Sequence, residues 1–394
     1  MQIVVSEELI EQFRARTASA STSVPLAVLE LDGRDVLRVT GIAEVLGPAP
    51  QVVYSRGPVP GYDRVEADFH VQSGIPAELQ VIPGLQHLFS RQKGVLESDL
   101  LQGKRLVIVG MGSVGSVCAV ELVKSGFMQF TLVDFDRLEL TNIARHACGL
   151  KDLGRYKTRA VADLLLDKNP YCTVTSCDWD LTQHPEELEA VVAAADLVLV
   201  ATDNNHTRFA VNRHAVTHGK PVIFGRARKR AVGGDVLRVR PGETPCYQCI
   251  FGAFYRNVPE ETSQPVSAYG GTLTMAAEPG LALDIDFISL MMVKLAIQEM
   301  VRDTGSTLNQ TLPEDLAAPL YLWANRREAG VGFADWTPLS QSALEMTILR
   351  WYGVDYPRDP DCPACGDFVS AALAGRGLDE IREEERSLFR GSAD

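Results

Sequence analysis

The hydrophobic pattern divides the chain into a short N-terminal part and a longer part in which apolar runs alternate with helical segments. Before residue 88 the pattern predicts a helix over 6–16 and half-buried strands over 24–31 and 35–39. Prolines and glycines interrupt the residues that follow, so this stretch is expected to be rich in loops. We therefore expect a small α+β domain over residues 1–87.

From residue 104 onward, short apolar runs bounded by turn residues alternate with amphipathic segments. The predicted strands are 105–110, 130–134, 197–201 and 222–225, and the predicted helices are 114–126, 157–169 and 284–302. This alternation is typical of an α/β fold with a parallel sheet, and it predicts a doubly wound, Rossmann-like arrangement. Residues 242–282 have no clear period and are expected to form a long crossing loop. The charged tail over 369–394 predicts a solvated helix.

Composition narrows the range of functions. The 38 basic and 51 acidic residues give a formal net charge of −13, which argues against a nucleic acid or an anionic membrane bound through bulk charge. No apolar stretch reaches about 18 residues, and the first residues lack the basic segment of a signal peptide. We expect a cytoplasmic protein with no membrane partner.

Four of the eight cysteines predict a metal site. Cys246 and Cys249 form one Cys-x-x-Cys pair, and Cys362 and Cys365 form a second. Four thiolates are the closed tetrahedral set that structural Zn²⁺ prefers. Because such a set leaves no open position for a substrate, the site is expected to tie the end of the chain to the crossing loop and to have no catalytic role.

A glycine-rich turn predicts a nucleotide site. Gly110, Gly112 and Gly115 follow a predicted strand and begin a predicted helix, where backbone N–H groups can hold phosphates. Asp134 lies at the end of the next strand, where its carboxylate can accept hydrogen bonds from ribose hydroxyls. The combination indicates an adenine nucleotide.

Further charged and polar residues follow the predicted strands. Asn142, Arg145 and Lys157 come after the second strand, and Asp203 and Asn204 come after the third. Two cations and a carboxylate at strand ends suit a triphosphate and its Mg²⁺, because the cations neutralise charge that develops on departing pyrophosphate. Hydride transfer does not need these charges.

These motifs resemble the ThiF/MoeB-like family of ubiquitin-activating-type adenylyltransferases. The matching segments are 89–92, 110–115, 132–136, 141–145, 154–157, 201–204 and the two cysteine pairs. The resemblance implies an adenylation domain over residues 88–368, ATP as a substrate, Mg²⁺ and Zn²⁺ as cofactors, and a symmetric homodimer.

The resemblance also implies roles for individual residues. Asp134, with Asp136 beside it, would hold the ribose, and Asn142, Arg145 and Lys157 would hold phosphates. Asp203, followed by Asn204, would organise Mg²⁺, and Arg91 would reach the partner's ATP across the dimer. The implied reaction is the attack of a C-terminal carboxylate on the α-phosphate of ATP, which releases pyrophosphate and forms an acyl-adenylate.

One position departs from the family pattern. Ala276 lies where many relatives keep a cysteine that forms a thioester or a persulfide. Three explanations stay open: the protein only adenylates, another cysteine serves, or the cysteine was replaced to trap a complex. Cys118 is expected in the core, Cys148 is a weak candidate thiol, and the histidines, including His146, are expected to be structural or to lie at the surface.

Several functions are compatible with these residues. The favoured one is activation of a ubiquitin-like protein for a conjugating enzyme or a sulfur donor, with the N-terminal domain favouring a bacterial conjugation pathway such as a ubiquitin-like antiviral defence system. The second is a peptide adenylyltransferase that resembles the microcin-maturing branch. A nicotinamide dehydrogenase and a non-catalytic scaffold are the remaining alternatives.

Overall fold

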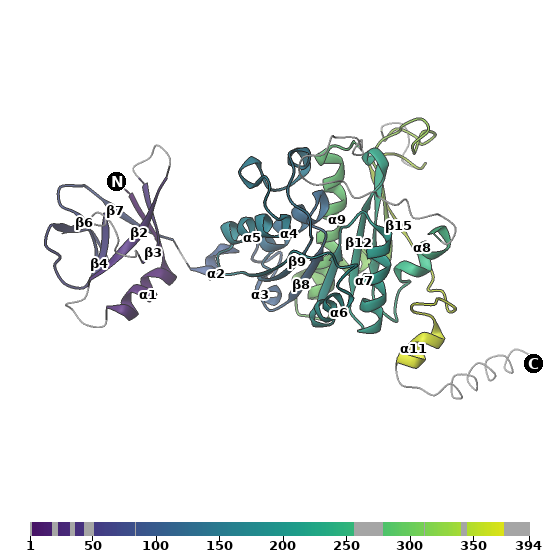
Figure 1. Cartoon of the computed structure of the whole chain (residues 1–394), viewed down its shortest axis with the longest axis horizontal. Helices are drawn as coiled ribbons and strands as arrows, with labels where there is room; N and C mark the ends of the chain where they lie inside the picture. Colours follow the sequence, from purple (N-terminus) through teal and green to yellow (C-terminus); the bar gives the residue numbers. More distant parts are fainter. Residues whose placement is uncertain are drawn as a thin grey trace, which may run out of the picture. The chain divides into compact units, whose positions relative to one another are not determined.

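The computed structural model describes residues 2–17, 23–31, 36–42, 51–82, 84–255, 279–310, 312–339 and 345–373. The chain divides into two compact units, Met1–Arg91 and Gln92–Asp394 (Figure 1). In the described residues no helix combines the length and the apolar character that crossing a membrane requires.

The first unit contains a seven-stranded sheet in the order β5-β6-β4-β2-β3-β1-β7. The strands are β1 (Gln2–Ser6), β2 (Ser23–Leu31), β3 (Val36–Ile42), β4 (Val52–Ser55), β5 (Tyr62–Arg64), β6 (Phe69–Gln72) and β7 (Glu78–Ile82). β1 runs parallel to β3 and β7, and the other pairs are antiparallel. The helix α1 (Glu7–Arg16) is capped by Ser6 and buries Ile10 and Phe13, and α2 (Leu85–Leu88) follows the sheet.

The second half of this unit, which was predicted to be rich in loops, also contains short strands that had not been predicted. The four strands from β4 to β7 lie there, and each has only three to five residues. Strands this short, separated by glycine and proline, give too few positions for an alternating pattern to stand out.

The second unit is built on an eight-stranded sheet in the order β10-β9-β8-β11-β12-β13-β14-β15. Its strands are β8 (Arg105–Val109), β9 (Gln129–Val133), β10 (Thr173–Cys177), β11 (Leu197–Val200), β12 (Val222–Ala227), β13 (Gly233–Val239), β14 (Leu320–Ala324) and β15 (Arg350–Val354). The sheet is parallel from β10 to β12 and antiparallel from β12 to β15.

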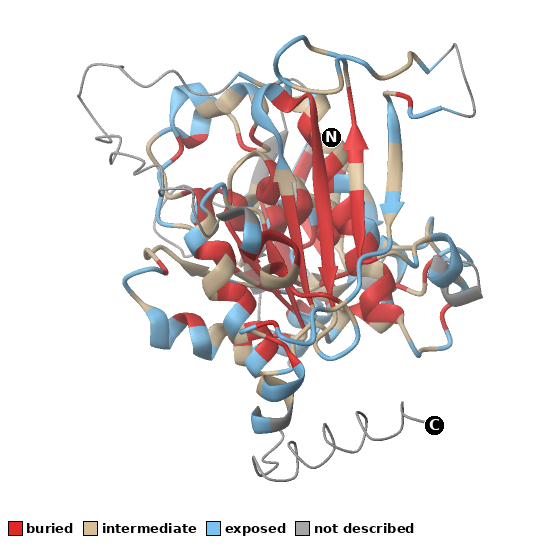
Figure 2. Cartoon of the chain, turned by 90° about the vertical axis from the view of Figure 1, so that its right-hand side faces the viewer, coloured by how far each residue is buried: buried red, intermediate tan, exposed pale blue. Residues whose placement is uncertain are grey.

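Helices cover both faces of this sheet. The helices are α3 (Asp99–Gln102), α4 (Ser113–Ser125), α5 (Lys157–Lys168), α6 (Pro185–Ala194), α7 (Asn205–Thr217), α8 (Tyr247–Tyr255), α9 (Ala282–Val301), α10 (Leu312–Asp315) and α11 (Asp367–Leu373). Residues of α4, α5 and α9 form the core on one face, and residues of α6, α7 and α8 form the core on the other. Figure 2 shows the buried strands between these two layers.

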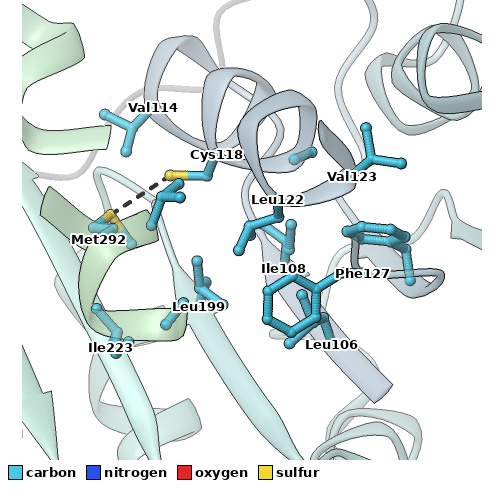
Figure 3. Close-up of a cluster of buried hydrophobic side chains, with 14 of the residues drawn as sticks. Leu106, Ile108, Val114, Cys118, Leu122, Val123, Phe127, Leu199, Ile223 and Met292 are labelled. Atoms are coloured by element: carbon cyan, nitrogen blue, oxygen red, sulfur yellow. Dashed lines mark hydrogen bonds between the residues drawn. The ribbon is translucent and has the colours of Figure 1, made fainter. Parts of the chain in front are cut away.

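The position of β8 between the two cores explains why its sequence is almost entirely apolar. Leu106 and Ile108 point into the core beneath α4 and α9, where Cys118 and Met292 also lie (Figure 3). The alternate residues Val107 and Val109 belong to the core on the opposite face. A strand that is buried on both sides needs apolar residues at consecutive positions.

The expected Rossmann-like, doubly wound α/β fold is thus confirmed, with two corrections of detail. The sheet ends in three antiparallel strands, β13, β14 and β15, which had not been predicted. The predicted crossing loop over 242–282 contains the helix α8, whereas residues 256–278 of it lie outside the described residues. Of the expected tail helix over 369–394, only the part within α11 is described.

Candidate nucleotide-binding site and four-cysteine cluster

The glycine turn joins β8 to α4 at the carboxyl edge of the parallel strands. Gly110 has a φ of +91°, and a Cβ there would lie 2.9 Å from the carbonyl carbon of Ala201. A Cβ on Gly115 would lie 1.8 Å from the carbonyl oxygen of Gly110, so only glycine lets the helix approach the turn this closely.

Gly112, unlike Gly110 and Gly115, is not crowded by neighbouring atoms of the described residues. It is the N-cap of α4 without a side-chain cap, and apart from its chain neighbours no atom of the described residues lies within 4 Å of the position that its Cβ would take. As far as the described residues go, the first turn of α4 is therefore accessible at its N-terminal end, where backbone N–H groups and the helix dipole favour an anion.

Asp134 lies beside this turn at the end of β9. Its Oδ2 accepts a hydrogen bond from the Met111 N–H at 2.6 Å, and its Oδ1 accepts one from the Asp136 N–H at 2.8 Å. Burial raises the pKa of the Asp134 carboxyl, and the ammonium of Lys157 opposes that shift. The carboxylate is thus held in one orientation by backbone donors, as a ribose-binding group requires.

Lys157 is the first residue of α5 and brings a buried cation to the same edge. Its Nζ lies 2.7 Å from Oδ2 of Asp136, and the Lys157 side chain is 10% exposed against 51% for Asp136. The ammonium is therefore fixed at the border of the site by a carboxylate that is open to solvent. Successive contacts thus connect the ammonium of Lys157 to Asp136, Asp136 to Asp134, and Asp134 to the glycine turn.

The segment that carries Asn142 and Arg145 is a short 3₁₀ helix, Leu140–Arg145. Asn142 caps it, because its Oδ1 accepts a hydrogen bond from the Glu139 N–H at 3.0 Å. The next residue, His146, is buried and connects this segment to the glycine turn: its Nε2 lies 2.7 Å from the Met111 carbonyl oxygen, and its Nδ1 accepts from the Cys148 N–H at 3.0 Å.

Arg145 lines an open pocket of about 890 Å³. Its lining also includes Gly280, Arg230 and Arg326. Arg230 has a φ of +58°, and its carbonyl oxygen accepts a hydrogen bond from the Arg326 guanidinium. The guanidinium of Arg326 also pairs with Asp284, 2.5 Å away, so paired charges border the pocket.

Asp203 follows β11, the strand next to β8 in the sheet, and its side chain is exposed. Asn204 is the N-cap of α7, and its Oδ1 accepts hydrogen bonds from the N–H groups of His206 and Thr207 at 2.7 and 3.3 Å. The sheet order puts Gly110 on the strand between those that carry Asp134 and Asp203. The carboxyl ends of three adjacent strands therefore supply the candidate site.

The four predicted cysteine ligands meet in one cluster, although the two pairs lie far apart in the sequence. Their sulfur atoms all lie within 4.8 Å of one another, with Cys246 to Cys249 at 3.8 Å, Cys246 to Cys362 at 3.7 Å and Cys249 to Cys365 at 3.4 Å. A tetrahedral zinc with Zn–S bonds of about 2.3 Å separates its sulfur ligands by about 3.8 Å. The cluster fits such an ion.

Two of the candidate residues stand apart from this geometry. Arg91 is the last residue of the first unit and its side chain is exposed. Ala276 lies outside the described residues.

His146 was expected to be structural or at the surface, and it is structural: it is a buried link between the Arg145 segment and the glycine turn. Sequence reasoning missed two further residues that shape the site. Arg208 donates a hydrogen bond to the carbonyl oxygen of Thr202, beside Asp203, and Tyr247 reaches the start of α7. No sequence signal pairs these residues with their partners, because the contacts are long-range or involve backbone oxygens.

Comparisons with known proteins identify relatives of the segment that contains the glycine turn, Asp134, Lys157 and Asp203. The model of the ThiF family matches residues 87–319. The chain is 31% identical to molybdopterin-synthase adenylyltransferase of Escherichia coli, over 40% of this chain and 63% of that protein. It is 29% identical to ubiquitin-like modifier-activating enzyme 5 of Dictyostelium discoideum, over 41% of this chain and 45% of that protein. The matches thus span less than two thirds of these relatives.

A solved structure shows the same fold. The crystal structure of E. coli MccB with selenomethionine MccA superimposes with a TM-score of 0.51 and 19% identity, over 72% of this chain and 75% of that chain. The family model covers more than half of the chain, including the glycine turn, Asp134, Lys157 and Asp203. From these findings together, the chain belongs to the ThiF family.

Proposed function

We propose that this protein is an ATP-dependent adenylyltransferase that activates the C-terminal carboxylate of a ubiquitin-like protein. The observation that carries the proposal is the buried Lys157, which pairs with Asp136 beside Asp134 and the glycine turn in a chain of the ThiF family. A dinucleotide site needs the glycines and the carboxylate, but it does not need a buried ammonium at the same edge.

ATP would bind across the carboxyl ends of β8, β9 and β11. The ribose hydroxyls would donate to Asp134, whose oxygens keep further lone pairs besides those that accept the Met111 and Asp136 N–H groups. The first turn of α4 would receive phosphate oxygens. Arg145 and Lys157 would approach the phosphates from the neighbouring segments.

Asp203 is the carboxylate that would hold Mg²⁺, because it is exposed and follows β11 at this edge. The ion, when bound, would neutralise charge on the triphosphate. Asn204 would act indirectly: its side-chain oxygen caps α7 and thereby fixes the backbone next to Asp203.

The reaction forms one bond and breaks another. A carboxylate oxygen of the substrate's C-terminus attacks the α-phosphorus, the bond to the bridging oxygen breaks, and pyrophosphate leaves with the electron pair. Arg145 and Lys157 would stabilise the charge that develops on the departing pyrophosphate. No side-chain nucleophile is needed, so the step does not depend on a cysteine near Ala276.

The pocket of about 890 Å³ next to Arg145 supports a polypeptide substrate. It is large enough for several residues of an extended chain, and it runs from the phosphate-binding segment to Gly280 and Leu349. The substrate's C-terminus would enter here. A ubiquitin-like modifier is named in one relative and a molybdopterin synthase in another, so a sulfur-carrier protein is the first alternative. A short peptide is the second.

Further parts of the proposal concern assembly and organisation. Zinc in the four-cysteine cluster would fasten the segment before α11 to the start of α8. The protein would act as a homodimer in which Arg91 reaches the partner's ATP, and a conjugating enzyme of a bacterial defence pathway would accept the activated protein. Residues 88–368 would form the adenylation domain, and residues 1–87 a separate domain that precedes it.

Pyrophosphate exchange into ATP tests the substrate class. The purified protein is mixed with ATP, labelled pyrophosphate and a glycine-ended ubiquitin-like protein encoded beside it, and the same protein with an amidated C-terminus serves as the control. Exchange that needs the free carboxylate supports the proposal. Exchange driven by a short peptide and not by the ubiquitin-like protein would instead assign the chain to the peptide alternative.

A second experiment addresses the position of Ala276. In the Ala276→Cys variant, a protein–protein bond that an added thiol cleaves but a non-thiol reductant leaves intact would be a thioester and would indicate an activating enzyme for a conjugation pathway. If neither form yields a thioester while exchange proceeds, the protein only adenylates.

A further inference from the structure

Tyr247 lies between the four-cysteine cluster and the loop that carries Asp203. It directly follows the cluster residue Cys246, begins α8 and is completely buried. Three aromatic rings surround it, with ring centroids 4.6 to 5.0 Å away: Phe209, Phe224 and Phe251. A buried phenol needs a hydrogen-bond partner for its hydroxyl, so the contacts of this group show what the residue is placed to do.

The hydroxyl and the backbone N–H of Tyr247 both form hydrogen bonds with residues of α7. Its hydroxyl donates to Oδ1 of Asn205 at 3.1 Å, and its backbone N–H donates to Oδ1 of Asn212 at 2.9 Å. The hydroxyl also accepts a hydrogen bond from Arg226 at 3.3 Å. Tyr247 thus fastens the cluster end of α8 to the first turn and to the middle of α7.

From Asn205 the contacts continue to the Asp203 loop. Oδ1 of Asn205 accepts a second hydrogen bond, from Nη1 of Arg208 at 2.9 Å. The Nη2 of Arg208 donates to the carbonyl oxygen of Thr202, the residue before Asp203. Thr202 also lies close to the glycine turn, since a Cβ on Gly110 would lie 2.9 Å from its Cγ2.

Arg208 also places a positive charge next to Thr202. It is 7% exposed and forms no ion pair within the described residues, whereas the neighbouring Arg226 is paired with the buried Asp235 through contacts of 2.7 and 2.9 Å. Burial lowers the pKa of the Arg208 guanidinium, and Arg226 acts in the same direction, whereas Tyr247 and Asp235 oppose the shift. The buried guanidinium therefore holds the loop through two neutral acceptors, Oδ1 of Asn205 and the carbonyl oxygen of Thr202.

We infer that Tyr247, Asn205 and Arg208 are positioning residues that hold the backbone at Thr202 and Asp203 for the metal-bound nucleotide. The inference rests on the proposed function insofar as Asp203 serves MgATP. It assigns the start of α8 a second role besides carrying the cluster ligand Cys246: its phenol hydroxyl helps to orient the Asp203 loop through Asn205, the first residue of α7.

The test uses the full chain with Tyr247→Phe, which removes the hydroxyl and keeps the ring. The KM for MgATP in pyrophosphate exchange is expected to rise about three- to tenfold, the effect of losing one buried hydrogen bond. The kcat is expected to stay within about twofold, because the lost contact orients the bound nucleotide in ground and transition states alike. Zinc content is expected to match that of the wild type.

Tyr321→Phe is the matched control. Tyr321 lies on β14 and is buried like Tyr247, but its hydroxyl has no hydrogen-bond partner among the described residues. The control is therefore expected to leave the KM unchanged. Asn205→Ala breaks the same relay from α7 and is expected to reproduce the rise in KM, and combining it with Tyr247→Phe should add little.

Hydrogen exchange of the amides of residues 202–208 separates this inference from the proposed function. Faster exchange there in Tyr247→Phe and Asn205→Ala, but not in Tyr321→Phe, is expected even if the protein uses another nucleotide. Unchanged exchange and unchanged KM, with only a lower melting temperature, would overturn the inference. Absence of pyrophosphate exchange in the wild type would instead overturn the proposed function and leave the amide result to decide the relay.

Discussion

At the scale of single residues, the three glycines of the turn have separable tasks. A methyl group on Gly115 would overlap the carbonyl oxygen of Gly110, whereas one on Gly112 would meet none of the described residues within 4 Å except its chain neighbours. We expect Gly115→Ala to lower the free energy of unfolding by about 1–3 kcal/mol, as overpacking does. Urea denaturation of the purified variant measures this loss.

Gly112→Ala is the matched substitution for nucleotide binding. Its backbone has a φ of −79°, which alanine adopts freely, so stability is expected to stay near that of the wild type. ATP affinity is expected to fall, because the methyl group occupies the space through which phosphate oxygens approach α4. If calorimetry finds ATP bound equally well by this variant, phosphates do not bind at this turn.

His146 gives the site a dependence on pH. Its Nδ1 accepts the Cys148 N–H, so the ring is neutral and its Nε2–H donates to Met111; burial accordingly lowers the pKa of His146 below its ordinary value of 6.5. The unfolded chain then takes up this proton at a higher pH than the folded chain. Stability from this residue is present above about pH 6.5 and is lost as the pH falls towards the folded-state pKa.

Comparison with a variant isolates this contribution. The decrease in the free energy of unfolding between pH 7.5 and pH 5.5 is expected to be smaller in His146→Gln than in the wild type. His184→Gln, at an exposed position, is expected to keep the wild-type decrease. Equal pH dependence in all three proteins would contradict a neutral, buried His146.

At the scale of secondary structure, patterns strong enough to span several residues could be predicted from the sequence. The strand β8 and the helix α9 follow from continuous or periodic apolar positions, and the predicted boundaries differ from the observed ones by two residues or fewer. The strands β13 and β15 contain glycines, Gly233 and Gly234 in the first and Gly353 in the second, which weaken the apolar pattern. The strand β14 contains none, but it has only five residues, and a run this short gives a weak signal.

The four-cysteine cluster connects the start of α8 to the segment that precedes α11. We expect about one zinc per chain by elemental analysis, and loss of this zinc in Cys362→Ser. If zinc binds only the folded chain, its removal costs about 4 kcal/mol at a free concentration a thousandfold above its Kd. Thermal denaturation before and after chelation measures the effect.

Cys177→Ser provides the control for the cluster, because Cys177 lies at the end of β10 outside it. This variant is expected to retain zinc and to respond to chelation as the wild type does. A wild-type protein that contains no zinc after purification in zinc-supplemented medium would contradict the assignment.

At the scale of the whole molecule, the sequence was informative where chemistry depends on residue type and spacing. Spacing alone indicated the cysteine cluster, and position after predicted strands indicated Asp134 and Asp203. The contacts of His146, Arg208 and Tyr247 could not be predicted in this way, because they join backbone carbonyls and amides whose proximity exists only in the folded chain.

The central claim, adenylation at the carboxyl edge of the parallel strands, depends on Asp203. Its carboxylate is exposed, and the adjacent Asn204 caps α7 without it, so Asp203→Ala is expected to preserve folding and zinc content. The most direct measurement is ATP–pyrophosphate exchange by the wild type and by Asp203→Ala, each with the glycine-ended partner. Exchange by the wild type and its loss in the variant is the expected result; an Asp203→Ala enzyme that exchanges at the wild-type rate would contradict the account.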